Sequence, residues 1–204
     1  GLVFLFSAVD GVEPQSETNW RLANNYNVPR IGFVNKMDRQ GADFLNVCRQ
    51  VKEMLGSKAV PLQIPIGAEA DFKGVVDLIN FRGVVWNEDD MGMTFQEVPI
   101  PDDLLEEATE YRELLLEAVA EHDDTLMEKY FEDPESLTER EILDALREAT
   151  IAGDFVPMMC GSAFKNKGVQ AMLDMVMEIL PSPLDVDAIV GTNPNTEEEE
   201  KRKP

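Results

Sequence analysis

The first sixty residues alternate between continuous apolar runs and amphipathic stretches. Residues 2–9, LVFLFSAV, and residues 30–34, RIGFV, are rich in β-branched and aromatic residues, which predicts strands buried on both faces. The stretch between them, EPQSETNWRLANNYN, predicts a helix with Pro14 in its first turn. Apolar side chains on one face predict a second helix from about Asp43 to Leu55, with Gly56 as its stop. This strand-helix-strand-helix order predicts a parallel sheet with right-handed crossovers.

The middle of the chain has a different pattern. Residues 60–100 contain three short strand-like runs, VPLQIPIG, GVVDLINFRGVVW and MTFQEVPI, separated by Gly, Pro and polar turns. One long acidic helix is then expected from about Asp102 to Tyr130. A further helix begins at Thr138, where Thr138 and Glu141 form a capping box, and stops near Gly153.

The first pattern returns near the end. Residues 155–160, FVPMMC, predict a buried strand, and a last helix follows from about Lys167 to Leu180. The fold class is therefore α/β: a parallel sheet with flanking helices, interrupted by a mixed α+β insert. The expected domain limits are 1–60 together with 155–183 for the sheet domain, 61–154 for the insert, and 184–204 for a disordered polar tail.

The charge of the chain indicates which kinds of partner it can bind. The chain has 204 residues, 44% of them hydrophobic, and a net charge of −22, so it is globular and acidic. Residues 101–150 hold 18 Asp or Glu against 4 Lys or Arg. Such a surface repels nucleic acid and attracts a basic protein partner. The alternative is a solvated helical face that only keeps the protein soluble.

Cysteine use and hydropathy argue against a disulfide-linked or zinc-binding protein and against a membrane-spanning protein. Cys48 and Cys160 sit in no paired motif, so neither a disulfide framework nor a zinc site is expected, and a reducing cytoplasm fits best. No apolar run reaches the roughly 18 residues of a membrane span, and no signal segment opens the chain. Because Gly1 stands inside an apolar run, we expect a fragment of a longer protein.

The motif NKMD, residues 35–38, follows the second strand and has the chemistry to read guanine. The Asp38 carboxylate can accept hydrogen bonds from both N1–H and the 2-amino group, which adenine does not offer. Asn35 can tie the loop and reach N7, and Lys36 can lay its methylene stem along the base. Taken alone, the motif fits an ordinary strand-to-helix loop with an Asx turn equally well.

A second loop strengthens the guanine hypothesis. The stretch GSAF, residues 161–164, also follows a buried strand and precedes a helix. Ser162 can hold the Asp38 carboxylate, the Ala163 N–H can donate to guanine O6, and Gly161 permits close approach of the backbone. Two complementary loops at the ends of neighbouring strands are hard to obtain by chance.

These motifs resemble the bacterial elongation factor G family of translational GTPases. The resemblance rests on GVEPQSET, VPRIGFVNKMDRQGADF, GVVDLI, LMEKYFED and CGSAFKNKGVQAMLDMVMEILPSPLDV, and it runs from Leu2 to about Val190. It implies a partial P-loop-GTPase-type sheet, a guanine nucleotide (GTP or GDP) as ligand, and the ribosome as partner, with translocation as the task. The base-contacting residues that it implies are Asn35, Lys36, Asp38, Ser162, Ala163 and Phe164. It also implies that the insert is a subdomain of the G domain, with the acidic helix 102–130 as dock for the ribosomal stalk protein.

This sequence contains no recognisable binding motif for the phosphates of GTP or GDP. The phosphate-loop motif G-x-x-x-x-G-K-[ST] does not occur in it, and DFKG at residues 71–74 is interpreted as a turn. The only histidine, His122, is interpreted as a partly exposed helical residue. The resemblance places the phosphate loop, the switches, the catalytic His and the Mg²⁺ ligands before Gly1. We therefore expect only base contacts here, no catalytic or metal-binding residue, and no GTP hydrolysis by this piece alone.

Other interpretations stay open at this point. The chain can be a protein-interaction module that docks the stalk protein and has no nucleotide function in isolation. It can also belong to a related class, such as a ribosome-protection factor or a release-type translational GTPase, or be an unrelated α/β protein with chance motifs.

Overall fold

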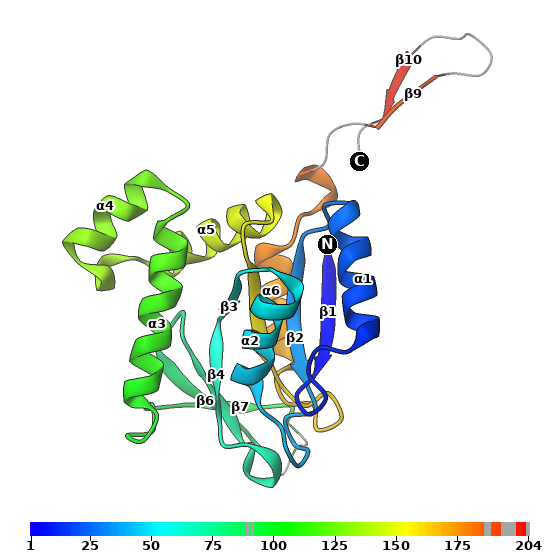
Figure 1. Cartoon of the computed structure of the whole chain (residues 1–204). Helices are drawn as coiled ribbons and strands as arrows, with labels where there is room; N and C mark the ends of the chain where they lie inside the picture. Colours follow the sequence, from blue (N-terminus) through cyan, green and yellow to red (C-terminus); the bar gives the residue numbers. More distant parts are fainter. Residues whose placement is uncertain (89, 91, 186–188, 193–198, 203–204) are drawn as a thin grey trace.

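The centre of the molecule is a four-stranded sheet with strand order β1-β2-β8-β3 (Figure 1). The computed structural model describes residues 1–88, 90, 92–185, 189–192 and 199–202. The sheet consists of β1 (Leu2–Ser7), β2 (Arg30–Asn35), β3 (Ala59–Pro61) and β8 (Val156–Cys160). All its strand pairs are parallel, so the carboxyl ends of β1, β2 and β8 meet at one edge. The predicted α/β fold is confirmed.

Helices cover both faces of this sheet. The helices on these faces are α1 (Pro14–Asn25), α2 (Phe44–Leu55) and α6 (Val169–Ile179), together with α5 (Glu139–Ala152) from the end of the insert. Successive side chains of a strand point to opposite faces. Accordingly Val34 of β2 belongs to the cluster with α1 and α2, whereas its neighbour Phe33 belongs to the cluster with α5 and α6. This is why the sequence of β2 reads as a continuous apolar run.

The insert begins with a second, antiparallel sheet of order β4-β5-β6-β7. Its elements are β4 (Gln63–Ile66), the short 3-10 helix η1 (Glu69–Asp71), β5 (Gly74–Asp77), β6 (Arg82–Trp86) and β7 (Phe95–Val98). The run VPLQIPIG, predicted from its pattern as one strand-like unit, divides at Leu62 between β3 of the parallel sheet and β4 of the antiparallel sheet. The chain therefore passes from one sheet into the other with a single residue between them.

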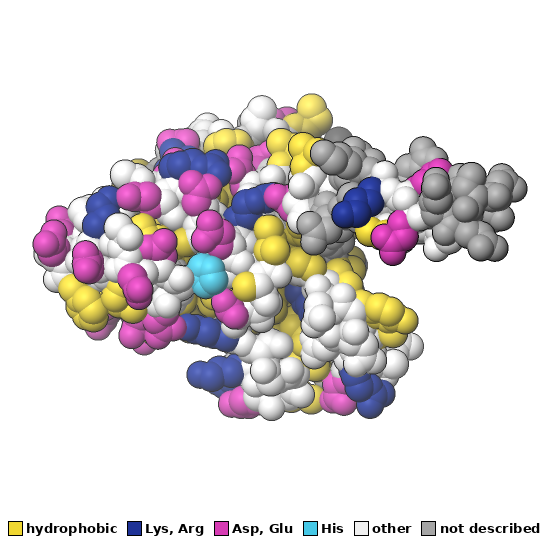
Figure 2. All heavy atoms as spheres, turned by 90° about the horizontal axis from the view of Figure 1, so that it is seen from above, with side chains coloured by type: hydrophobic (Ala, Val, Ile, Leu, Met, Phe, Trp, Pro, Cys, Tyr) yellow, Lys and Arg dark blue, Asp and Glu magenta, His cyan; other side chains and the backbone are white. Residues whose placement is uncertain are grey.

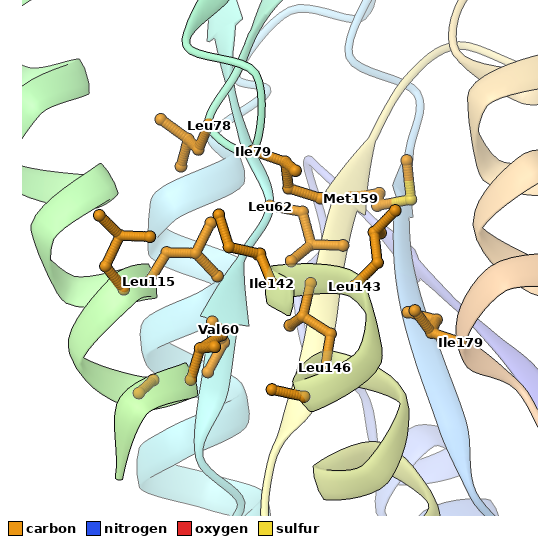
Figure 3. Close-up of a cluster of buried hydrophobic side chains, with 14 of the residues drawn as sticks. Val60, Leu62, Leu78, Ile79, Leu115, Ile142, Leu143, Leu146, Met159 and Ile179 are labelled. Atoms are coloured by element: carbon orange, nitrogen blue, oxygen red, sulfur yellow. The ribbon is translucent and has the colours of Figure 1, made fainter. Parts of the chain in front are cut away.

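One hydrophobic cluster joins the insert to the sheet domain (Figure 3). Leu115 of α3 (Leu105–Ala120) and Ile142 of α5 lie in it together with Val60 of β3 and Met159 of β8. The insert therefore shares a core with the sheet, and α5 also contacts β2 and β8 directly. The domain limits at 60/61 and 154/155 remain a prediction.

The acidic segment 102–130 is not one helix, and that prediction is wrong. α3 ends at Ala120, and α4 (Asp124–Glu132) begins after a turn. The cause is Asp123, whose side chain accepts hydrogen bonds from the N–H groups of Thr125 and Leu126 and so caps a new helix. His122 lies in this turn rather than in a helix, with its Nδ1 3.1 Å from a carboxylate oxygen of Asp154.

Two further expectations need correction. β1 is the edge strand of the described sheet, and Leu5 is 61% exposed, so β1 is not buried on both faces. In the tail, expected to be disordered, β9 (Ile189–Thr192) and β10 (Glu199–Arg202) pair as antiparallel strands after the 3-10 helix η3 (Pro183–Asp185). Pairing satisfies the backbone N–H and C=O groups with which the two strands face each other. The rest of the predicted tail, residues 186–188, 193–198 and 203–204, lies outside the described residues.

Both cysteines are free and buried, and burial raises the pKa of each thiol. In the described part of the chain, the helices are all too short or too polar to cross a bilayer.

Arg112 fixes α3 on the antiparallel sheet, and its removal is expected to destabilise the fold. Its Nη1 donates to the carbonyls of Leu78 (2.6 Å) and Ile79 (3.0 Å), and the residue is 7% exposed. Arg112→Leu leaves both carbonyls without this donor, which is expected to lower the free energy of unfolding by about 2 to 4 kcal/mol. Urea denaturation measures the loss. Arg49→Leu, at an exposed position, is the control, and an equal effect of the two variants would contradict this role.

The capping box of α5 predicts a pH dependence of stability. Hydrogen bonds from Lys129 Nζ and from the backbone and hydroxyl of Thr138 lower the pKa of Glu141 from 4.5 to about 2. A lowered carboxyl pKa stabilises the fold above the unfolded value, and this contribution is lost as pH falls through the folded value. Glu141→Gln should therefore be less stable than the parent above pH 4.5, and the difference should vanish as pH falls toward 2. Urea midpoints across this range measure it, with Glu132→Gln as control; a difference independent of pH would disprove the role of the charge.

Candidate functional site

Three loops meet at the carboxyl edge of the parallel sheet (Figure 1). Residues 8–10 follow β1, residues 35–41 form the loop that we name base loop 1, and residues 161–168 form base loop 2 after β8. A cavity of about 610 Å³ opens between them. Its walls are Val9, Asp10, Asn35, Lys36, Asp38, Arg39, Gln40, Ser162 and Phe164. Five of the six residues predicted to contact a base thus line one cavity.

Asn35 ties the two base loops together. Its side-chain Oδ1 accepts one hydrogen bond from the Lys36 N–H (2.8 Å) and another from the Ala163 N–H (2.9 Å). Lys36 has a φ of +68°, a backbone conformation that residues other than glycine adopt at an energetic cost. The Ala163 N–H was expected to be free for a ligand, but in this structure Asn35 occupies it. The tie uses only the oxygen of the Asn35 amide, and its nitrogen takes no part in these two bonds.

Asp38 and Ser162 form the second link between the loops. The Ser162 hydroxyl donates to Asp38 Oδ1 at 2.6 Å, across 124 residues of sequence. Ser162 is 1% exposed, so this donor is fixed by its burial. The Arg39 Nε lies 4.0 Å from the other oxygen, Asp38 Oδ2. The predicted pairing of the serine with the carboxylate is present, and one carboxylate oxygen stays available to a ligand.

Gly161 stands where base loop 2 leaves β8. Its N–H donates to the Val34 carbonyl, and its own carbonyl accepts from the Met37 N–H at 3.1 Å. A Cβ at this position would lie 2.7 Å from the Phe33 ring. Only glycine therefore allows base loop 2 to pack this closely on β2 and base loop 1.

The rim contains residues that the sequence interpretation did not single out. Lys36 Nζ lies 3.6 Å from Asp10 Oδ2, and a hydrogen bond from the Ser7 hydroxyl, together with the Lys36 charge, lowers the pKa of Asp10. Val9 and the 86% exposed ring of Phe164 supply apolar surface. Val9 and Asp10 directly follow β1, so the neighbouring parallel strand was the signal that pointed to them.

The chemistry of the cavity suits a planar heterocycle. A carboxylate oxygen accepts N–H donors, the Asn35 amide and the Lys36 stem border the same space, and Phe164 offers an aromatic face. Among the residues that the structure describes, no group of three or more His, Cys, Asp or Glu side chains is placed to hold a metal ion.

A second cavity, of about 370 Å³, lies between the antiparallel sheet and α6. Trp86, Phe95 and Met175 contribute to its apolar walls, and Asp77 and Asp174 to its polar ones. None of the six predicted base-contacting residues lines it, so we assign the site to the cavity of about 610 Å³.

Comparison with known proteins gives a consistent result. Residues 1–182 match the family model described as "Elongation factor Tu GTP binding domain". Over 204 residues the chain is 73% identical to elongation factor G of Cytophaga hutchinsonii and 59% identical to that of Amoebophilus asiaticus, in each case covering 100% of this chain. The corresponding protein of Karelsulcia muelleri is 54% identical over 203 residues. The chain spans 29% of the length of each of these relatives.

A solved structure agrees in fold. A crystal structure of a protein from Thermus thermophilus superposes with a TM-score of 0.78 at 27% identity, covering 91% of this chain and 28% of that one.

Proposed function

The chain belongs to the family of elongation factor Tu GTP binding domains, and on this premise we propose that its cavity of about 610 Å³ binds the guanine base of GTP or GDP. The observation that carries the proposal is the hydrogen bond of 2.6 Å from Ser162 to Asp38. It holds one carboxylate oxygen and orients the carboxylate toward a ligand. The 73% identity to elongation factor G of Cytophaga hutchinsonii supports a guanine nucleotide as the ligand.

The base is read by its donors. Asp38 accepts from N1–H and the 2-amino group of guanine, and adenine leaves the same carboxylate unpaired. Asn35 donates its side-chain amide to N7, and Lys36 packs its stem along the ring. For Ala163 to donate to O6, its N–H must share or exchange the bond to Asn35. Phe164 covers the base from the open side.

The role of the whole protein is an extension of this proposal. We infer that the chain is part of a translational GTPase of the elongation factor G type, which promotes ribosomal translocation. Residues 1–204 contain no G-x-x-x-x-G-K-[ST] loop. The contribution of this region is therefore base recognition, and Mg²⁺ is not expected to change the affinity of residues 1–204 for GDP. Phosphoryl transfer depends on phosphate and Mg²⁺ contacts that these residues do not supply, so no GTP turnover by them alone is expected.

A second function, docking of the ribosomal stalk protein, is favoured by α3. Glu106, Glu110, Glu113 and Glu117 recur at helical spacing and are all exposed. Acidic side chains gather over the insert helices at the left of Figure 2. Leu114, 49% exposed beside them, offers an apolar contact. A basic partner is attracted to such a ridge.

The substitution Asp38→Asn tests the guanine proposal. Asp38→Asn replaces an acceptor oxygen by an amide donor, which matches xanthine, whose 2-position carries a carbonyl in place of the amino group. We expect GDP affinity to fall at least about tenfold and xanthosine diphosphate affinity to rise, as measured by calorimetric titration. Asp102→Asn, on the exposed surface outside the cavity, is the matched control. An unchanged preference for GDP in Asp38→Asn would refute the assignment of Asp38.

Charge reversal tests the docking function independently. Changing the four glutamates of α3 to lysine is expected to weaken binding of the stalk protein more than about tenfold. Raising the salt concentration from about 50 to 200 mM should also weaken binding of the stalk protein to the parent chain, because salt screens exposed charges. Reversals of exposed charges on other elements, at Glu17, Glu53 and Asp174, are the control. If the α3 variant retains full affinity, the stalk protein does not dock on this ridge.

A further inference from the structure

Backbone strain gathers around the proposed base site. Among the described residues, five that are not glycine have a positive φ: Asn27, Lys36, Glu69, Phe81 and Asn166. Three of the five, Lys36 (68°), Glu69 (57°) and Asn166 (54°), belong to loops at or beside the proposed site. Lys36 lies in base loop 1 and Asn166 in base loop 2. Glu69 belongs to residues 67–73 of the insert, which we name the insert loop. Strained residues persist where the surroundings hold them, and they mark functional sites often enough to ask what holds these three.

Glu69 of the insert loop holds base loop 1 at two points. Its N–H donates to the Met37 carbonyl at 2.9 Å, and its side-chain Oε1 accepts from the Gly41 N–H at 2.8 Å. These contacts lie on either side of Asp38. The left-handed conformation of Glu69 lets one residue present both its backbone and its side chain to the same loop.

Lys167 holds base loop 2 against the insert. It is 7% exposed, and its Nζ donates to the Phe72 carbonyl of the insert loop (2.8 Å) and to Glu88 Oε1 after β6 (2.9 Å). The hydrogen bond and the charge of Lys167 lower the pKa of Glu88. A buried ammonium is retained only where such partners satisfy it. It therefore fixes the distance between base loop 2 and the insert.

The backbone of Lys167 connects this anchor to the base-reading groups. The Ser162 N–H donates to the Lys167 carbonyl at 2.9 Å, and the Lys167 N–H donates to the Ser162 carbonyl at 3.0 Å. Ser162 in turn donates to Asp38. A continuous path thus runs from Phe72 and Glu88 of the insert through Lys167 and Ser162 to the Asp38 carboxylate.

Two more contacts hold the insert against the end of β8 and base loop 2. Gln63 Nε2 of β4 donates to the Cys160 carbonyl at 3.1 Å, and a Cβ on Gly92 would come within 2.8 Å of the Asn166 carbonyl. In Figure 1 the loops meet at the lower end of the parallel sheet. The insert is therefore in contact with both base loops at their tips, away from the shared hydrophobic core.

We propose that the insert sets the geometry of the guanine pocket, with Glu69 and Lys167 as positioning residues for base loop 1 and base loop 2. The proposal rests on the assignment of the cavity as a guanine site. Neither residue lines the cavity, so each acts through a loop that does. A consequence is that a change in the insert loop alters how well the chain distinguishes guanine from bases that lack the 2-amino group.

The first arm of the test needs no ligand. Amide hydrogen exchange is measured on the whole chain for Lys167→Met, Glu69→Ala and Glu69→Gln. Lys165→Met is the matched control, with the same loss of charge at an exposed position of the same loop. We expect exchange at Ser162 and Lys165 to quicken about tenfold or more in Lys167→Met, while Phe33 in β2 keeps its parent rate. We expect Gly41 to exchange faster in Glu69→Ala and to recover in Glu69→Gln, whose amide oxygen still accepts.

The second arm measures the preference for GDP over inosine diphosphate, which lacks the 2-amino group that Asp38 recognises. Lys167→Met and Glu69→Ala should reduce this preference several-fold, and Lys165→Met and Glu69→Gln should leave it at the parent value. The positioning role would be overturned if amide exchange at Phe33 quickened as much as exchange at Ser162 and Lys165. It would also be overturned if Lys165→Met and Lys167→Met changed exchange or nucleotide preference equally.

The two arms separate the two proposals. If the parent chain binds GDP selectively and the variants change neither exchange nor preference, the positioning role is wrong and the guanine site stands. If the parent binds neither nucleotide but local exchange quickens as expected, the insert holds the loops and the guanine assignment fails. Glu69→Ala, at an exposed position, keeps the test decisive if Lys167→Met does not fold.

Discussion

The parallel pairing of β2 with β8 is the constraint on which the site depends. Gly32, Phe33 and Val34 pair with Met158, Met159 and Cys160, so two strands more than a hundred residues apart in sequence end at the same edge of the sheet. Both strands are buried, because helices cover both faces. A slip by one residue would move side chains such as Phe33 and Val34 into the opposite hydrophobic clusters, which disfavours any other register. This register places Asn35 beside Ala163 and Asp38 beside Ser162. The geometry of the proposed base pocket is thus a consequence of core packing.

The insert adds a second layer of constraint. It shares the cluster around Leu115, Ile142 and Met159 with the sheet. It contacts the end of β8 through Gln63 and the base loops through Glu69 and Phe72. Burial of a lysine between the two units is unfavourable unless its ammonium has partners, and here Lys167 donates to Phe72 and Glu88. The acidic ridge of α3 and the proposed base pocket therefore belong to one packed body, although they are different surfaces of it.

The sequence was sufficient for features that are local or that depend on one periodicity. The strands β2 and β8, the capping box of Thr138 and Glu141, and the link between Asp38 and Ser162 follow from apolar runs, cap chemistry and complementary polar groups at strand ends. The break at Asp123 was missed because apolar and acidic residues continue across it, and the capping aspartate outweighs helix propensity there.

Features that arise from contacts between distant segments were not predictable in this way. The exposure of Leu5 depends on which strands flank β1, and the division of VPLQIPIG depends on two sheets that meet at Leu62. The bond between Ala163 and Asn35 depends on the pairing of β2 with β8, and the proposed roles of Glu69 and Lys167 depend on the packing of the insert against the base loops. The measurement that tests the account most directly is an amide-resolved NMR titration of the chain with GDP and, separately, with ADP. The account predicts that GDP shifts the amides of Asn35 to Asp38 and of Ser162 to Phe164 and that ADP does not. Equal shifts with both nucleotides, or shifts confined to other residues, would contradict it.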